Sequence, residues 1–149
     1  MIIALGSDHA GLNLKNEILA HLKEKEVEFK DFGTYTMESS DYPDFAEKVA
    51  EEVAKGNYNL GILVCGTGIG ISIAANKVAG IRAANCSDTF SAHACREHND
   101  ANILALGQRV VGVGVALDIV DTFLKATFEG GRHSTRINKI SDIEKKYNK

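Results

Sequence analysis

Short runs of aliphatic residues alternate with longer amphipathic stretches over most of the chain. Within the runs, apolar residues occupy consecutive positions, which is typical of strands that are buried on both faces of a parallel sheet. The run Leu60–Val64 is the plainest example, and the run Val27–Phe32, which Gly33 ends, is the weakest. The pattern predicts five strands, at 2–6, 27–32, 60–64, 81–84 and 103–106.

The stretches between these runs have the spacing of helices that bury one face. Leu14, Ile18 and Leu22 recur every four residues, and a similar series begins at Tyr42 and Phe45. Further helices are expected at about 69–77, from 88–89 onward, at 113–123 and in the polar tail to 149, with a basic loop at 129–135 before the tail.

The alternation of strands and helices indicates the class of fold. Five strand–helix units in succession predict an α/β protein, a three-layer α/β/α sandwich with a Rossmann-like sheet of five parallel strands. No internal repeat and no change of composition marks a boundary, so residues 1–149 are expected to form a single domain. Ligands of such sheets bind beyond the carboxyl ends of the strands, which directs attention to the loops that follow the strands.

Composition and charge narrow the functional classes. The chain has 149 residues, of which 44% are hydrophobic and 25% charged, and its formal charge of −3 gives no reason to expect nucleic acid or a membrane as a partner. No apolar run is long enough to span a membrane, and the first residues lack the basic region of a signal peptide. Cys65, Cys86 and Cys95 have neither zinc-site spacing nor an even number. These observations favour a cytoplasmic protein without a metal centre.

The loop after the third strand, which reads CGTGIG from Cys65 to Gly70, carries the strongest chemical signal. Closely spaced glycines let the backbone turn sharply, so that several N–H groups can converge on an anion. The loop departs from the dinucleotide fingerprint GxGxxG and lacks the lysine of a P-loop. Asp88 lies where the fingerprint would place a ribose-binding acid, but its position also suits a helix cap. A bound anion or a developing oxyanion therefore fits the loop better than a nucleotide.

Cys65 stands at the beginning of this loop. A cysteine at a strand end is more often a small buried apolar residue than a reactive thiol. Amide donors and the start of a helix nevertheless favour the thiolate form. Asp8 and His9 directly follow the first strand and are expected at the same edge of the sheet. The simpler reading of this pair is a helix cap beside a surface histidine.

Polar residues gather in three further segments. His98 and Asn99 precede the fifth strand, so a single chain would place them at the edge opposite the glycine loop. Arg109 follows the fifth strand, and Arg132 and Arg136 would share one face of a helical turn. Arginine binds phosphate in a bidentate manner. Capture of a phosphate and a solvated basic surface explain the three arginines equally well.

Several motifs occur in order along the chain: GSDHAG, DFGT, YPDFA, CGTGIGISIAANK, REHNDANILALG and GGRHSTRI. Together they resemble the ribose-5-phosphate isomerase B family, which is grouped with the subunits of galactose-6-phosphate isomerase. The resemblance covers the whole chain and implies a homodimer, or a dimer of dimers, whose sites are shared across the subunit interface. It also implies interconversion of ribose 5-phosphate and ribulose 5-phosphate without a cofactor, in the non-oxidative branch of the pentose phosphate pathway.

The resemblance implies a role for each matching residue. Cys65 is implied as the base that moves a proton between C1 and C2, and His98 as the acid that helps to open the furanose ring. The other implied residues are Asp8 and Thr67 near the same end of the sugar, His9, Arg109, Arg132 and Arg136 as phosphate ligands, Asn99 as a substrate contact, and the amides of Gly66, Thr67, Gly68, Ile69 and Gly70 around the enediolate oxygen.

One branch of the family has glycine in place of the loop cysteine and a glutamate one residue after the last loop glycine, where this chain has Ile71. The thiol is therefore the only plausible base in the loop. Two alternatives stay open: an isomerase of a six-carbon sugar phosphate, such as allose or galactose 6-phosphate, and a sugar-phosphate-binding regulator without catalysis. The presence of both Cys65 and His98 argues against the regulator, because a binding protein needs neither a base nor a ring-opening acid.

Overall fold

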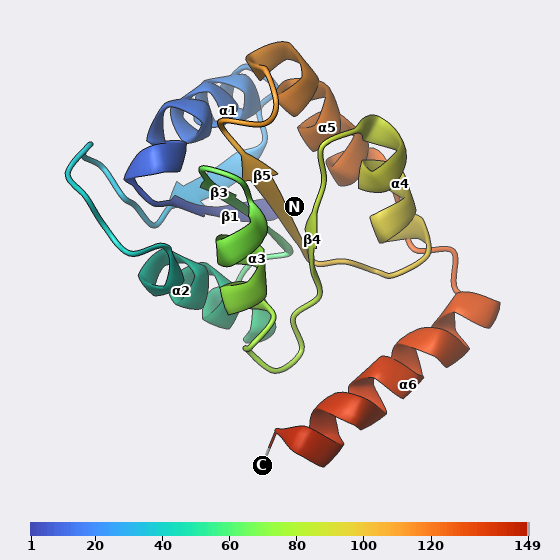
Figure 1. The fold of residues 1–149 in the computed structure, drawn as a ribbon. Coiled ribbons are helices and arrows are strands. Elements are labelled where there is room, and N and C mark those ends of the chain that lie inside the picture. Colours follow the sequence, from blue (N-terminus) through green and yellow to red (C-terminus); the bar gives the residue numbers. More distant parts are fainter. Residues whose placement is uncertain (149) are drawn as a thin grey trace.

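The computed structural model describes residues 1–148, and a sheet of five parallel strands forms its centre (Figure 1). The strand order is β2-β1-β3-β5-β4, with bounds β1 (Ile2–Ser7), β2 (Glu28–Asp31), β3 (Leu60–Cys65), β4 (Ala83–Asn85) and β5 (Ile103–Gly107). The five predicted strands are thus confirmed, with boundaries that shift by one or two residues. β4 begins after Arg82, because the amide of Arg82 donates to the side chain of Asn102 at 2.8 Å.

Helices cover both faces of the sheet, which confirms the three-layer α/β/α fold (Figure 1). One face carries α1 (Leu12–Glu24), α4 (Thr89–Glu97) and α5 (Val113–Lys125), and the other carries α2 (Tyr42–Ala54) and α3 (Ile69–Ala75). A short 3₁₀ turn, η1 (His9–Gly11), leads into α1. Within residues 1–148, no helix has the length and apolar character that a membrane crossing requires.

The central strand β3 explains the continuous apolar run of the sequence. All six of its residues are buried, and successive side chains point to opposite faces. Ile62 and Val64 belong to the core beneath α1, α4 and α5, whereas Leu63 and Cys65 belong to the core beneath α2 and α3. The thiol of Cys65 therefore lies on the α2–α3 face of the sheet.

The other two cysteines lie across the sheet from Cys65. Cys86 and Cys95 are buried in the core beneath α4 and α5, with their sulfur atoms 4.0 Å apart. The sheet separates them from Cys65, which agrees with a structural role for both.

The last helix, α6 (Arg132–Tyr147), extends away from the layers (Figure 1). The helical tail is confirmed, but the expected basic loop at 129–135 is partly wrong, because α6 already begins at Arg132. Gly130 and Gly131 have positive φ values of 70° and 57°, and the amide of His133 donates to the Gly130 carbonyl at 3.1 Å, which closes the first turn early.

Most of α6 is exposed to solvent. Only His133 is buried in this helix, whereas Ile140, Ile143 and Tyr147 are 47%, 59% and 72% exposed. These three residues border a hollow of about 510 Å³ between α6 and the edge strand β4. An amphipathic helix is normally stabilised by burial of its apolar face, so this surface lacks a partner in the single chain.

Candidate active site

The carboxyl ends of β1, β3 and β5 meet at one edge of the sheet. Ser7 pairs in register with Val64, and Cys65 pairs with Gly107. The loops that follow are tied together by their backbones, since the amide of Arg109 donates to the Gly66 carbonyl at 3.0 Å. Five predicted site side chains lie at the ends of these three strands or in the loops that follow them: Asp8, His9, Cys65, Thr67 and Arg109. We call this set the strand-end group.

Cys65 is 4% exposed, and its sulfur accepts a hydrogen bond from the Gly68 amide at 3.1 Å. Gly68 donates in this direction because its φ is 79°, a left-handed conformation that glycine adopts without strain. A side chain there would also collide with Asn85, since an added Cβ would lie 2.3 Å from the Asn85 carboxamide oxygen. The Gly68 amide therefore fixes the position of the sulfur at the start of the loop.

The loop uses two of its five predicted amide donors internally. The Gly68 amide bonds the thiol, and the Ile69 amide donates to the Thr67 hydroxyl at 3.2 Å. The amides of Gly66, Thr67 and Gly70 have no acceptor among residues 1–148. These three are therefore the donors available to an anion in this loop.

Asp8 caps the turn that follows β1, as the simpler reading predicts, and lies at the expected edge of the sheet. The carboxylate is 6% exposed, and its Oδ1 accepts from the Gly11 amide at 3.1 Å, which makes Asp8 the cap of η1. Gly11 permits a close approach to β3, because an added Cβ would lie 2.4 Å from the Val64 carbonyl oxygen. The second carboxylate oxygen has no bond among the described residues and stays available for a proton.

His9 is held by a residue that the sequence did not single out. Its Nδ1 accepts from the Ser40 amide at 3.1 Å, and its own amide donates to the Ser40 hydroxyl at 3.2 Å. Because a backbone amide can only donate, Nδ1 carries no proton, so the neutral ring has its proton on Nε2. His9 can therefore donate to a phosphate oxygen.

The segment that carries Ser40 is anchored by a buried cation. Lys15 is fully buried, and its Nζ donates to Asp31 Oδ1 at 2.6 Å and to the Thr34 carbonyl. Burial lowers the pKa of Lys15, while the hydrogen bond and charge of Asp31 act in the opposite direction. A lysine in an apparently amphipathic helix gives no sequence signal of this role, because lysines in that setting are usually solvated.

Arg109 and Tyr42 close in on the glycines of the loop. A Cβ on Gly66 would lie 3.2 Å from a guanidinium nitrogen of Arg109, and a Cβ on Gly70 would lie 2.6 Å from the Tyr42 ring. The glycines thus permit close approach of other side chains as well as a sharp turn. Tyr42 was expected only as part of a helix, since it begins the apolar series of α2.

The remaining predicted residues lie elsewhere in the chain. His98 caps the carboxyl end of α4, with its amide 2.8 Å from the Ala94 carbonyl, and Asn99 follows it. Arg132 and Arg136 are exposed in the first turns of α6. His98, Asn99, Arg132 and Arg136 form what we call the helix-end group. His98 and Asn99 lie toward the amino end of β5, as expected, and one chain does not bring the helix-end group to the strand-end group.

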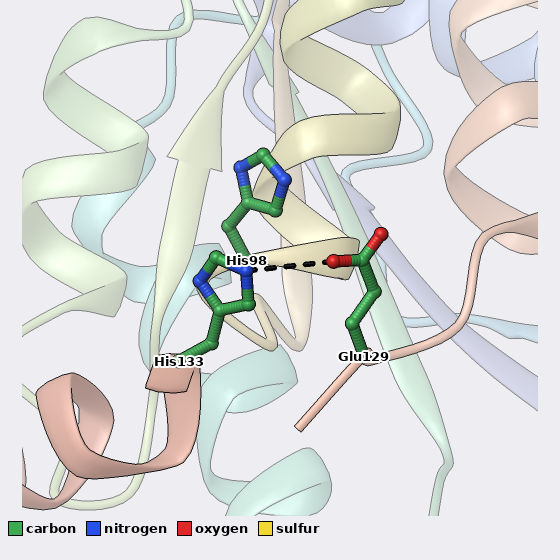
Figure 2. Close-up of side chains that lie close together, drawn as sticks. All are labelled: His98, Glu129 and His133. Atoms are coloured by element: carbon green, nitrogen blue, oxygen red, sulfur yellow. Dashed lines mark ion pairs between the residues drawn. The ribbon is translucent and has the colours of Figure 1, made fainter. Parts of the chain in front are cut away.

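Two residues that the sequence did not predict join the helix-end group (Figure 2). The ring of His133, from α6, stacks on that of His98 with centroids 4.5 Å apart and planes inclined by 12°. Glu129 lies 3.4 Å from His133 Nε2. The only sequence signal was the place of His133 between two candidate phosphate-binding arginines.

The ligand atoms of His98, Glu129 and His133 lie within 4.8 Å of one another, which raises the question of a metal site. Histidine binds a metal in the plane of its ring. The two rings are nearly parallel, with planes inclined by 12°. Ring contact and the pairing of His133 with Glu129 account for this proximity.

Comparison with known proteins assigns the chain to a family. Residues 3–140 match the ribose/galactose isomerase family. The chain is 56% identical to the ribose-5-phosphate isomerase B of Escherichia coli strain K12 over 146 residues, 98% of each chain. It therefore belongs to the ribose/galactose isomerase family.

Solved structures agree with this assignment. The ribose-5-phosphate isomerase B of Clostridium thermocellum superimposes with a TM-score of 0.98 at 64% identity, over 99% of both chains. That of Mycoplasma genitalium, solved with bound ribulose 5-phosphate, gives a TM-score of 0.93 at 48% identity, over 97% of this chain and 96% of the other.

Proposed function

We propose that this chain, acting as a single sugar-phosphate isomerase domain over residues 1–149, interconverts D-ribose 5-phosphate and D-ribulose 5-phosphate. The observation that carries the proposal is the Cys65 thiol, buried beside an amide donor at a strand-end loop. It occurs in a chain whose relatives are ribose-5-phosphate isomerases B. We also propose a cytoplasmic location.

Ring opening is the first step, because ribose 5-phosphate is mostly a closed furanose. In the proposal, His98 gives a proton to the ring oxygen as the C1–O4 bond breaks, and the free oxygen of Asp8 takes the proton of the C1 hydroxyl. An imidazole suits this task because it titrates near neutral pH. Thr67, whose exposed hydroxyl lies in the same loop as the base, would contact this end of the sugar.

Proton transfer between carbons follows. The Cys65 thiolate removes the proton from C2, a C1–C2 double bond forms, and the electron pair moves to O1. The unpaired amides of the loop stabilise that charge, since preorganised donors in a site shielded from water act most strongly on charge that develops in the transition state. The thiol then returns a proton to C1, while the hydroxyl proton of O2 passes to O1, and the ketose results.

The phosphate takes no part in these steps, and its binding holds C1 and C2 against the base. His9 and Arg109 from the strand-end group, and Arg132 and Arg136 from the helix-end group, are the proposed ligands. Asn99 is a proposed substrate contact.

A second copy of the chain would bring the two groups together. The exposed apolar residues of α6, and the hollow that they border, support a homodimer in which this surface is covered. In the proposal, the helix-end group of one protomer completes the strand-end group of its partner. A dimer of such dimers would keep the same shared site.

Conversion of ribose 5-phosphate by the purified protein, followed with a chelator and without added cofactor, tests the proposal. Turnover under these conditions is expected, and its absence in a folded dimer would contradict the proposal. A parallel measurement of kcat/KM for allose 6-phosphate and galactose 6-phosphate tests the six-carbon alternative.

A further inference from the structure

His133 and Glu129 lie beside His98, yet the proposed reaction does not use them. His133 is 7% exposed, although it belongs to the first turn of a helix that is otherwise exposed. Its ring is nearly parallel to that of His98 and stacks against it, with centroids 4.5 Å apart, and Figure 2 shows the two rings next to each other. Solvation at the surface does not explain why this histidine is buried within an otherwise exposed basic segment.

The stack is anchored to α4 from two directions. The amide of Glu129 donates to the carbonyl of Glu97, the residue before His98, at 3.0 Å. The carboxylate of Glu129 lies 3.4 Å from His133 Nε2, within ion-pair distance. His98 is itself bonded to α4 through its amide. The three residues therefore form one arrangement at the end of α4.

We propose that His133 is a positioning residue, which, fixed by Glu129, holds the His98 ring in the orientation needed to open the furanose. This inference rests on the proposed function. A histidine at the end of a helix has two side-chain torsions and only partial burial to restrain it, whereas a general acid must be placed to within a fraction of an ångström. A parallel ring packed on one face restrains both torsions of His98 without blocking its in-plane nitrogens.

Ring opening and proton transfer can be measured separately, because ribose 5-phosphate requires both steps and ribulose 5-phosphate requires only proton transfer. Ribulose 5-phosphate cannot close a furanose ring, because the C5 oxygen that would attack C2 is esterified. In D₂O, Cys65 should exchange the C1 hydrogen of ribulose 5-phosphate for deuterium through the enediolate. This exchange needs the base but no ring-opening acid.

The test compares three variants by ribose 5-phosphate turnover and by NMR of the C1 exchange. His133→Ala is expected to lower kcat for ribose 5-phosphate by about 10- to 100-fold, the effect of a misplaced catalytic group, with KM and the exchange rate within about threefold. His133→Phe keeps a flat ring on His98 and should restore kcat to within about threefold of the wild type. His93→Ala serves as the matched control, because His93 forms a similar pair with Glu97 on α4, at 2.8 Å, without stacking on His98.

Three outcomes would overturn the inference: wild-type kcat in His133→Ala, a raised KM with unchanged kcat, as expected of a phosphate ligand, or parallel loss of turnover and exchange. If His133→Ala does not fold, Glu129→Gln replaces it, since Glu129 is exposed and the change is isosteric. Glu129→Gln should lower kcat for ribose 5-phosphate by about two- to fivefold and leave the rate of C1 exchange nearly unchanged. An equal loss of turnover and exchange, or no loss of turnover, would contradict the inference. Failure of the proposed function would look different, because the wild-type protein would then lack both turnover and exchange.

Discussion

The strand-end group and the helix-end group are held in place by different means. Strand pairing and backbone bonds fix Cys65, Asp8 and Arg109 within one chain, and glycines bring their loops into contact. The helix-end group instead lies at the end of α4 and on α6, which leaves the layers with its apolar residues exposed. In the proposal, the base is thus part of the folded monomer, whereas delivery of the acid and of two arginines depends on a second copy.

Replacement of the proposed base, Cys65, should have the largest effect, because it removes the proton-transfer group and leaves the helix-end group intact. Cys65→Ala is expected to lower kcat by about 10³-fold, in the range found for loss of a general base. Substrate binding measured by calorimetry should change little, since the phosphate ligands remain. Turnover within a few-fold of the wild type would exclude the thiol as the base, and an unchanged Tm would show that the fold is intact.

Mixed dimers test directly whether the two groups belong to different protomers. In a dimer of one Cys65→Ala chain and one His98→Ala chain, one site loses both residues and the other keeps both. Random mixing of the two inactive variants should therefore restore about a quarter of wild-type activity, as two-fold symmetry requires. If native mass spectrometry shows exchanged subunits and activity does not recover, the site is not shared.

A charged residue on the apolar side of α6 should separate the two protomers. It would thereby separate the strand-end group from the helix-end group without changing a residue of either. Ile143→Asp places a carboxylate where the partner is proposed to pack, and burial of an unpaired charge should raise the dimer dissociation constant by about 100-fold or more. Sedimentation should then show monomers, and activity should fall at low protein concentration. Lys145→Asp, an exposed position on another side of the same helix, is the control and should stay dimeric.

The same contrast explains how much the sequence could predict. Buried strands leave consecutive apolar residues, so the five strands and the loops at their ends could be located, and with them Cys65, Asp8 and His9. Ser40 and Lys15 could not be found, because their roles depend on contacts between segments far apart in the chain. The burial of His133 could not be predicted either. The sequence of a helix does not show which of its sides will be buried when the surface that covers it comes from another element of the chain.

Loss of one arginine should have the smallest effect, because several of the proposed ligands would share the phosphate. Arg136→Ala removes one charge-assisted hydrogen bond and is expected to raise KM by about tenfold, with kcat within about threefold. The matched control is Lys139→Ala, a loss of charge at an exposed position of the same helix, which should leave KM unchanged. Equal effects of the two variants would mean that α6 attracts the substrate only through its overall charge, and KM should then rise steeply with ionic strength in the wild type. A specific effect of Arg136 at high salt would instead place the guanidinium on the phosphate itself, and would make the helix-end group part of the binding site as well as the source of the acid.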